Sequence, residues 1–600
     1  MKFSEFAKYL DKLESIASRN EMTEVLAQLL KSLNKKEIKE AMYLMQGRVV
    51  PRFVPLEFNF AGKQMIKSIL KLGVGEKKLD RSYKKTGDLG LVAEELLKSR
   101  SKGLSIKEVY DSLRAIAELA GEGSVERKIN SVSELLKKLN KTEAKFVTRI
   151  LVGKLRLGLS DKTVLDAVSW SIKGDKTLRN IAERAYSVRS DMGEIVEQIL
   201  TDGIGSVGNL GVKAGLPVAS KLVERESTFE KLFERLGEHI IQPKYDGMRA
   251  QIHYSKKGFL LKASSSKHKI QNQSTLFTED SKETVRIFSR NMESLTEMFP
   301  DVAEAVSKLG VDSIVIDSEV IGFDENTGNF LPFQETSQRR RKYGVAEKVE
   351  SIPIKVMAFD ILYLNGKDLT LEKLEKRISK LETILKKDKT GRLVMSESPI
   401  VKSAKELESK FDEYVEQGLE GLISKKLDTQ YEPGTRNFDW IKLKFTVKSH
   451  LADTIDAVVL GYYQGQGQRA KFGLGALLLG VYNKKKERFE STAKLGTGIT
   501  DEEFIQIKKA LTKIEIKSKP KNVEVSKVLE PDVWVEPKIV VEVEADEITE
   551  SKTHTAGMKE GGKGLSLRFP RMKVFDRDKG PEQTTSIKEL KRLFKLQRTK

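Results

Sequence analysis

The stretch IQPKYDGMRAQ, residues 241–251, places a lysine directly before a Tyr-Asp-Gly turn. A lysine amine becomes a nucleophile once it loses its proton, and burial or neighbouring cations favour that loss. Lys244 is therefore a candidate nucleophile, in a turn shaped by Asp246 and Gly247 that brings Arg249 close. Taken alone, the stretch is equally compatible with a surface lysine that has no chemical role.

Two further lysines have the spacing of one strand face. In DWIKLKF, Trp440, Lys442 and Lys444 alternate with apolar residues, so their side chains share one side of an extended strand. Ammonium groups placed there would bind a phosphate as point charges. An exposed polar strand edge would show the same pattern.

Carboxylates occur at comparable positions. Asp317 and Glu319 share one face of SIVIDSEVIGF, and Glu420 lies just before the strand that carries Lys425. Such carboxylates suit Mg²⁺ bound to a triphosphate, because this ion prefers oxygen ligands. The chain has no cysteine and five scattered histidines, which excludes thiolate sites and argues against a histidine-rich metal site.

Three regions of the chain, each with a different residue pattern, must position these residues. The first 220 or so residues favour helices, and an apolar stripe at helical spacing in SVSELLKKLNK predicts a buried face. From about residue 235, β-branched segments alternate with helical ones, which predicts an α+β domain with antiparallel sheets. From about residue 450, short strands and glycine turns predict a small β-barrel. The apolar stripe in SVSELLKKLNK, in the helical region, consists of Val132, Leu135, Leu136 and Leu139.

Six hundred residues exceed what one hydrophobic core supports, so several domains are expected. We predict a helical domain over residues 1–225, an α+β domain over 226–447 and a barrel domain over 448–600. The final segment SIKELKRLFK predicts a helix opened by a capping box of Ser586 and Glu589.

The formal net charge of +20 predicts a polyanionic partner. Nucleic acid is favoured over membrane because the basic residues are spread along the chain; a basic protein without such a partner is the alternative. Lys154 and Arg156, which lie between the apolar stripes of the helical region, are candidate DNA contacts, and free N–H groups at helix starts such as KGLSIKEV would suit phosphates. No long apolar run or N-terminal signal segment is visible, which predicts a cytoplasmic protein without a membrane span. Charged residues at 32% and the absence of cysteine fit a heat-adapted organism.

Seven motifs follow one another along the chain: KYDGMR, FSRN, IDSEVIGF, FDILYL, EGLISKK, WIKLK and RFPRMKVFDRDK. Their order and approximate spacing resemble the nucleotidyltransferase motifs of ATP-dependent DNA ligases. With the N-terminal segment EAKFVTRILVGKLRLGL, the whole chain resembles the archaeal replicative type of that family. The resemblance implies an all-α DNA-binding domain, an adenylation domain on antiparallel sheets and a C-terminal OB-fold barrel.

The resemblance also implies a three-step reaction with ATP and Mg²⁺, for which Mn²⁺ is an alternative ion. Lys244 would take AMP from ATP, the AMP would pass to the 5′-phosphate of a nick, and the 3′-hydroxyl would displace it. The expected partner is nicked double-stranded DNA, with a sliding clamp by analogy, and the expected state is a monomer. Replication, repair and recombination of DNA are the implied processes.

Site residues carry over motif by motif. Arg249 and Glu319 resemble the contacts to ribose and reacting phosphates, and Phe359 resembles the aromatic ring that stacks on adenine. Glu319 and Glu420 are the implied metal carboxylates. The implied phosphate contacts are Arg290, Lys442 and Lys444.

The last motif lies in the barrel domain. It resembles the segment that closes over ATP in the first step and then moves away, which implies a hinge near Val447 to Asp453. The residues concerned are Arg571, Arg577, Asp578 and Lys579.

The chain departs from the family pattern at three places. Gln242 stands where many relatives have a glutamate that contacts the adenine amino group, so strict preference for ATP is an open question. Ser318 stands where glycine is common. A polar segment at 259–284 is longer than in relatives and predicts a mobile hairpin extension.

Two other functions compete with a DNA ligase. An RNA ligase or capping guanylyltransferase shares KxDGxR, but neither is expected to carry the large helical N-terminal region. A noncatalytic duplex-binding protein would explain the charge, but it would not require Lys244, Glu319 and Glu420 together.

Overall fold

The structure is a computed structural model that describes residues 1–98, 101–226, 228–259, 283–324, 330–331, 333–339, 345–417, 419–444, 454–465, 467–558 and 562–596. The chain divides into two compact units, Met1–Leu79 with Leu89–Lys444, and Asp80–Asp88 with Phe445–Lys600. The expected hinge, and the expected 259–284 extension apart from its ends, lie outside the described residues. No helix among the described residues is long and apolar enough to cross a membrane.

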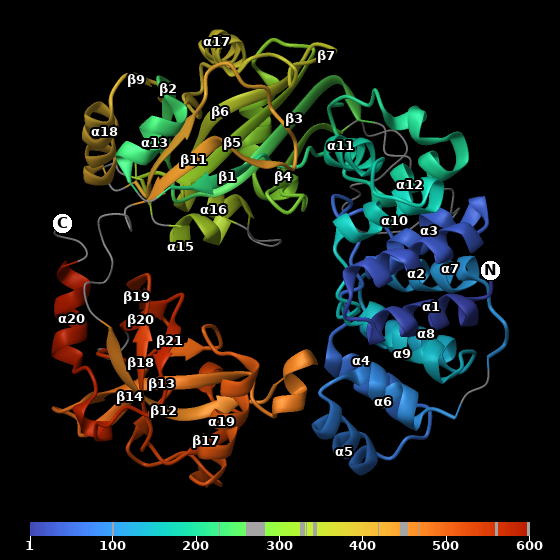
Figure 1. Cartoon of the computed structure of the whole chain (residues 1–600), viewed down its shortest axis with the longest axis vertical. Helices are drawn as coiled ribbons and strands as arrows, with labels where there is room; N and C mark the ends of the chain where they lie inside the picture. Colours follow the sequence, from blue (N-terminus) through green and yellow to red (C-terminus); the bar gives the residue numbers. More distant parts are fainter. Residues whose placement is uncertain are drawn as a thin grey trace. The chain divides into compact units, whose positions relative to one another are not determined.

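The N-terminal region is helical as predicted, and Figure 1 draws it in blue to cyan. The predicted apolar stripe is confirmed as core, because each of its four residues is at most 4% exposed. The helices are α1 (Phe3–Ser15), α2 (Arg19–Ser32), α3 (Ile38–Met45), α4 (Gly62–Leu70), α5 (Glu76–Thr86), α6 (Leu89–Leu96), α7 (Ile106–Glu118), α8 (Ser124–Leu136), α9 (Lys141–Leu151), α10 (Asp161–Lys173), α11 (Arg179–Arg189) and α12 (Met192–Asp202).

Two sheets form the centre of the following region. The first has the strand order β1-β11-β10-β2-β9, and the second has the order β4-β3-β5-β6-β7, with β8 beside β6. Most pairs are antiparallel as predicted, but β1 with β11 and β6 with β8 are parallel. The strands are β1 (Leu222–Arg225), β2 (His239–Lys244), β3 (Met248–Phe259), β4 (Glu283–Ser289), β5 (Ser313–Gly322), β6 (Ile354–Leu364), β7 (Lys367–Asp368), β8 (Leu393–Met395), β9 (Ile400–Val401), β10 (Gly421–Lys425) and β11 (Arg436–Lys444).

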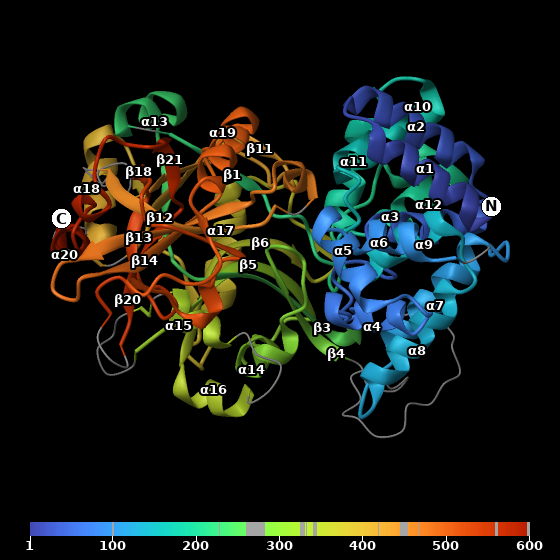
Figure 2. The ribbon, with the colours of Figure 1, turned by 90° about the horizontal axis from the view of Figure 1, so that it is seen from below.

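Helices cover these sheets, as Figure 2 shows for the same chain from another side. Buried apolar residues of β3, β5 and β6 pack against α14 and α17, while α18 packs beside β10 and α13. This packing holds the strands in fixed register. The helices are α13 (Phe229–Leu236), α14 (Pro300–Ser307), α15 (Phe333–Thr336), α16 (Val345–Ser351), α17 (Leu374–Leu385) and α18 (Ala404–Glu416).

The second unit is built on one curled sheet of order β15-β17-β12-β13-β14-β16, in which β18 pairs with both β12 and β21. Its core and the hairpin β19–β20 confirm the predicted barrel-like region. The predicted capping box is present, because Glu589 N–H donates to Ser586 Oγ at 3.2 Å and Ser586 N–H donates to Glu589 Oε2 at 2.7 Å. The elements are β12 (Ile455–Tyr463), β13 (Ala476–Asn483), β14 (Arg488–Leu495), α19 (Asp501–Thr512), β15 (Glu515–Ile516), β16 (Val523–Glu524), β17 (Val533–Val535), β18 (Val540–Glu544), β19 (Glu547–Ser551), β20 (Gly564–Arg568), β21 (Arg571–Val574) and α20 (Ile587–Leu596).

Candidate active site

Strands β2, β10 and β11 bring polar residues distant in sequence to one sheet face. Lys244 of β2 lies opposite Gly421 of β10, which lies opposite Lys444 of β11. Because directly opposed residues of neighbouring strands project to the same side, each cross-strand row adds to one surface. The next two rows are Gln242, Ile423 and Lys442, then Ile240, Lys425 and Trp440.

A cavity lies between this face and the sheet that contains β3, β5 and β6. Five of the predicted site residues line it: Gln242, Lys244, Arg249, Glu319 and Phe359. The remaining lining residues are Val223, Pro243, Tyr245, Ile423, Lys425 and Trp440.

A carboxylate joins two of the predicted lysines. Lys244 forms an ion pair with Glu420, and Lys444 Nζ lies 3.2 Å from the same carboxylate oxygen. Burial raises the pKa of Glu420, but Lys244 and Lys444 outweigh it and lower this pKa overall. Burial, followed by the charges of Lys444 and Lys244, lowers the pKa of Lys442. This concentration of positive charge suits a phosphate group.

Glu319 lies on the opposite sheet, where β5 pairs with β3 and places it beside Arg249. Burial raises the pKa of Glu319 to about 7, against the opposing charges of Lys244 and Arg249. Among the described residues no three acidic or histidine side chains form a group that could hold a metal ion. Glu319 and Glu420 remain the candidate oxygen ligands of a metal ion. Against burial, the charge of Lys244 acts to lower the pKa of both, so both carboxylates lie near this lysine.

Two glycines allow the strands to approach at the cavity. A Cβ atom on Gly247 would lie 2.5 Å from the carbonyl oxygen of Val320. Gly421 has φ of +134°, and a Cβ atom there would lie 2.3 Å from the carbonyl oxygen of Leu443. Gly247 therefore permits close packing against β5 as well as the predicted turn.

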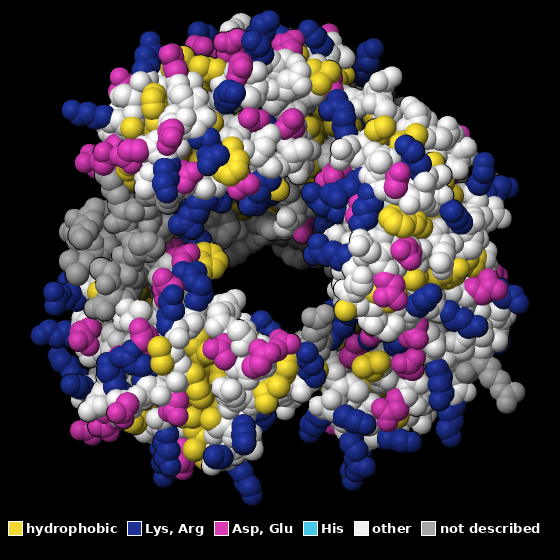
Figure 3. All heavy atoms as spheres, viewed as in Figure 1, with side chains coloured by type: hydrophobic (Ala, Val, Ile, Leu, Met, Phe, Trp, Pro, Cys, Tyr) yellow, Lys and Arg dark blue, Asp and Glu magenta, His cyan; other side chains and the backbone are white. Residues whose placement is uncertain are grey.

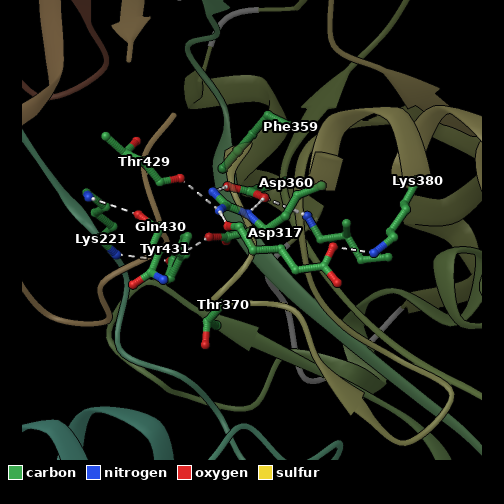
Figure 4. Close-up of polar contacts among 12 residues, drawn as sticks. Lys221, Asp317, Phe359, Asp360, Thr370, Lys380, Thr429, Gln430 and Tyr431 are labelled. Carbon is green, nitrogen blue, oxygen red and sulfur yellow. Dashed lines mark hydrogen bonds and ion pairs between the residues drawn. The ribbon is translucent and has the colours of Figure 1, made fainter. Parts of the chain in front are cut away.

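A buried network fixes Arg249. Its Nε donates to Asp317 Oδ1 at 3.0 Å, its Nη2 pairs with the other carboxylate oxygen, and Tyr431 donates its hydroxyl to Asp317 at 2.9 Å. Asp317 is thus committed to Arg249 and Tyr431, and Figure 4 shows its contact with Tyr431. The guanidinium carbon of Arg249 lies 5.1 Å from the centroid of the Phe359 ring.

Lys425 is a cavity residue whose role the sequence did not indicate. Its side chain is 1% exposed, and its Nζ lies 3.8 Å from the centroid of the Trp440 ring and 4.8 Å from that of Phe359. Neither Lys425 Nζ nor Trp440 Nε1 has a hydrogen-bond acceptor among the described residues. Burial lowers the pKa of Lys425 to about 7. The sequence signal that could have identified it is its spacing of two residues from Ile423, which puts both side chains on one face of β10.

Arg290 and the last motif lie outside the cavity. Arg290 is exposed directly after β4, and its charge contributes to lowering the pKa of Lys442. Arg571, Arg577, Asp578 and Lys579 belong to the second unit. There Arg571 Nη2 lies 2.6 Å from Asp546, Arg577 pairs with Glu542, Lys579 pairs with Asp456, and Asp578 is exposed.

The candidate DNA contacts Lys154 and Arg156 lie in the loop between α9 and α10. Arg156 has φ of 60° and lines a surface pocket with Arg52. The expected free helix start in KGLSIKEV is wrong for three N–H groups: a capping box occupies those of Ser105 and Glu108, and Ile106 N–H donates to the carbonyl oxygen of Met1. Figure 3 shows Lys and Arg side chains spread among acidic ones over the visible surface.

Comparison with known proteins places the chain in one family. Residues 2–169 match the DNA ligase N terminus, 276–444 the ATP dependent DNA ligase domain and 470–579 the ATP dependent DNA ligase C terminal region. The chain is 42% identical to a probable DNA ligase of Dictyoglomus turgidum, covering 100% of this chain and 98% of that protein. It is 37% identical to DNA ligase 1 of Methanosarcina acetivorans, covering 99% of each.

A solved structure, "Pmar-Lig_Pre.", has the same fold at a TM-score of 0.56 and 16% identity, covering 96% of this chain and 99% of that one. The three matched regions follow one another along the chain, and the relatives are matched over nearly their full length. The chain therefore belongs to the ATP-dependent DNA ligases, enzymes that join nicked DNA with ATP and a divalent metal ion.

Proposed function

We propose that Lys244 is the residue that carries AMP during nick sealing. Its neutral Nζ would attack the α-phosphorus of ATP; the bond to the bridging oxygen of the β-phosphate breaks, pyrophosphate leaves, and the nitrogen loses a proton. The 5′-phosphate of the nick then takes the AMP, and the 3′-hydroxyl attacks that phosphate and releases AMP. The observation that carries the proposal is the convergence of Lys244, Glu420 and Lys444 beside a cavity lined by Phe359 and Arg249.

The surrounding residues have separate proposed roles. Lys442, Lys444 and Arg290 stabilise phosphate charge in the transition state by preset positive groups. Phe359 stacks on the adenine, and Arg249, held by its buried carboxylate, contacts the ribose. Lys425 and Trp440 supply donors to nitrogen or oxygen acceptors of the nucleotide, since the described residues leave both donors unpaired at a cost of about 1–3 kcal/mol each.

Glu319 and Glu420 fit Mg²⁺, because this ion takes one or two protein carboxylates and completes its shell with phosphates and water. When bound, the ion would neutralise charge on the departing pyrophosphate. Glu420 pairs with Lys244 and Lys444, so it holds the lysine in place at the cavity. Mn²⁺ has the same ligand preference and is the proposed alternative ion.

The remaining roles follow from the family and the charge. We infer that the helical region, including Lys154 and Arg156, contacts the DNA backbone, because neutralisation of phosphates explains a net charge of +20. Arg571, Arg577, Asp578 and Lys579 act in the first step on pyrophosphate. We further infer a monomer that acts in the cytoplasm, where chromosomal DNA is replicated, repaired and recombined, and that meets a sliding clamp.

Adduct formation tests the nucleophile. The full chain incubated with α-labelled ATP and Mg²⁺ should gain an acid-labile AMP adduct, which nicked DNA then discharges as the nick is sealed. Lys244→Ala should form no adduct, whereas Lys402→Ala, at an exposed lysine outside the cavity, should match the unchanged protein. A labelled adduct that persists in Lys244→Ala would overturn the proposal.

A further inference from the structure

The amide of Gln242 is held in one orientation at the wall of the cavity. Gln242 is 2% exposed, and its Nε2 donates to the carbonyl oxygen of Phe359 at 3.2 Å and to Ser398 Oγ at 2.9 Å. These partners lie 117 and 156 residues away in sequence, so tertiary structure alone brings them to the amide.

Both partners accept in this arrangement. A carbonyl oxygen has no hydrogen to donate, and the one hydroxyl hydrogen of Ser398 goes to the carbonyl oxygen of Ser396, 3.0 Å away. A flipped amide would place Oε1 against two acceptors. The hydrogen-bond network therefore favours one orientation of the amide, with Nε2 toward Phe359 and Ser398.

The other end of the amide is left for a ligand. No described residue donates a hydrogen bond to Gln242 Oε1, although Gln242 lines the cavity together with Phe359. A donor on the bound molecule would therefore find an acceptor there that no described residue occupies. Adenine presents an amino group at position 6, whereas guanine and hypoxanthine present an oxygen there.

We propose that Ser398 is a positioning residue that turns Gln242 into a fixed acceptor, so that the cavity selects a 6-amino purine over a 6-oxo purine. This inference rests on the proposed nucleotide function of the cavity. Ser398 itself does not line the cavity and acts through Gln242. The glutamine thus behaves as the acceptor-only glutamate of relatives would, and the backbone of the stacking residue Phe359 contributes to the same selection.

Adduct formation with three nucleotides tests this role. Ser398→Ala removes one of the two acceptors, so the amide can turn and offer Nε2 to the base. We expect the ratio of kcat/KM for ATP over inosine triphosphate to fall about fivefold to tenfold, the effect of about one hydrogen bond. The change should lie in KM, with kcat at saturating ATP within about twofold of the unchanged protein. GTP should follow inosine triphosphate, which separates the 6-oxo group from the 2-amino group.

Two variants separate positioning from loss of structure. Ser398→Thr keeps the hydroxyl and should retain the selectivity, and Ser379→Ala, at an exposed serine of α17, should change nothing. A parallel loss of kcat/KM for all three nucleotides in Ser398→Ala would overturn the proposal, because it indicates a general defect. An unchanged ratio would also overturn it.

Failure of the proposed function itself would look different. In that case the unchanged protein would form no adduct with any nucleotide, so no selectivity ratio would exist. Adduct formation that is normal with ATP but equally fast with inosine triphosphate in the unchanged protein would leave Lys244 as nucleophile and overturn only the role of Ser398 and Gln242.

Discussion

Charged residues are held in two different ways in the cavity and in the segment 571–579 of the second unit. Behind the cavity, Arg249 makes a two-bond contact with Asp317, whose side chain is 0% exposed. In the second unit, Arg571 and its partner Asp546 have side chains that are 42% and 39% exposed. Removing one member of a buried ion pair leaves the other charge buried without a counter-ion. In an exposed ion pair, water solvates the remaining charge, so the cost in stability is small. We propose that the first arrangement presets a nucleotide site and that the second leaves cations available for a phosphate that arrives later.

The largest expected effect comes from the buried pair. Asp317→Ala leaves the guanidinium of Arg249 without its carboxylate and should lower the stability of the first unit by about 3–5 kcal/mol. Hydrogen exchange of peptides from β3 and β5 over a urea series measures this locally, because a chain of several domains need not unfold in one step. Asp546→Ala is the matched change at the exposed pair and should cost under about 1 kcal/mol. Equal losses in the two variants would contradict the distinction.

The exposed cations should matter for one step of catalysis. Arg577→Ala should lower the rate of adduct formation about 100-fold, the usual size of losing one preset positive or donor group at a reacting phosphate. Sealing of a nick that already carries AMP should stay within about threefold, because no pyrophosphate takes part in that step. Lys573→Ala, at a neighbouring exposed lysine of β21, is the control and should affect neither rate. Equal losses in both assays would show that Arg577 acts beyond the first step.

Much of the site was readable in the sequence because strands alternate their side chains. The spacing of Trp440, Lys442 and Lys444 predicted one shared face, and the cross-strand register places them in successive rows on it. The motif order likewise predicted that Lys244 and Glu420 belong to one fold, and they form an ion pair. Local periodicity and motif order therefore carry information that survives folding.

What the sequence could not supply are contacts between distant elements with ordinary local patterns. Asp317 looked like a metal carboxylate, yet it pairs with Arg249 and Tyr431 because β3 lies beside β5. Ser398 lies in a loop without a motif, and its contact with Gln242 depends on how β8 and β2 are placed. The free helix start was predicted wrongly because Ser105 and Glu108 close it, although their spacing in the sequence carries that signal.

The pH dependence of adduct formation should show which buried ionisable group of the cavity controls the reaction. Burial raises the pKa of Glu319 to about 7 and lowers that of Lys425 to about 7. If Glu319 binds metal as a carboxylate, kcat/KM for ATP should fall about tenfold per unit as pH drops below 7. Lys425→Met separates the two groups, because the acidic limb should persist in this variant when Glu319 causes it. Loss of the limb in Lys425→Met would assign it to the lysine, and would mean that Lys425 acts as a neutral amine.

The smallest expected effect concerns the carboxylate that holds Arg577. Glu542→Gln keeps the shape of the side chain but removes its charge, so Arg577 is freer to meet a triphosphate. The KM for ATP in adduct formation should fall about twofold, because the pair is partly open to solvent, with side chains that are 31% and 16% exposed, and Asp456 lies 3.7 Å from the same guanidinium. Salt should abolish the difference, since exposed charges are screened. Glu547→Gln breaks a comparable exposed pair with Arg568 and should leave KM unchanged. A higher KM in Glu542→Gln would mean that the carboxylate orients Arg577 toward the nucleotide. The ion pairs of the segment 571–579 would then position their cations for the ligand, as Asp317 positions Arg249.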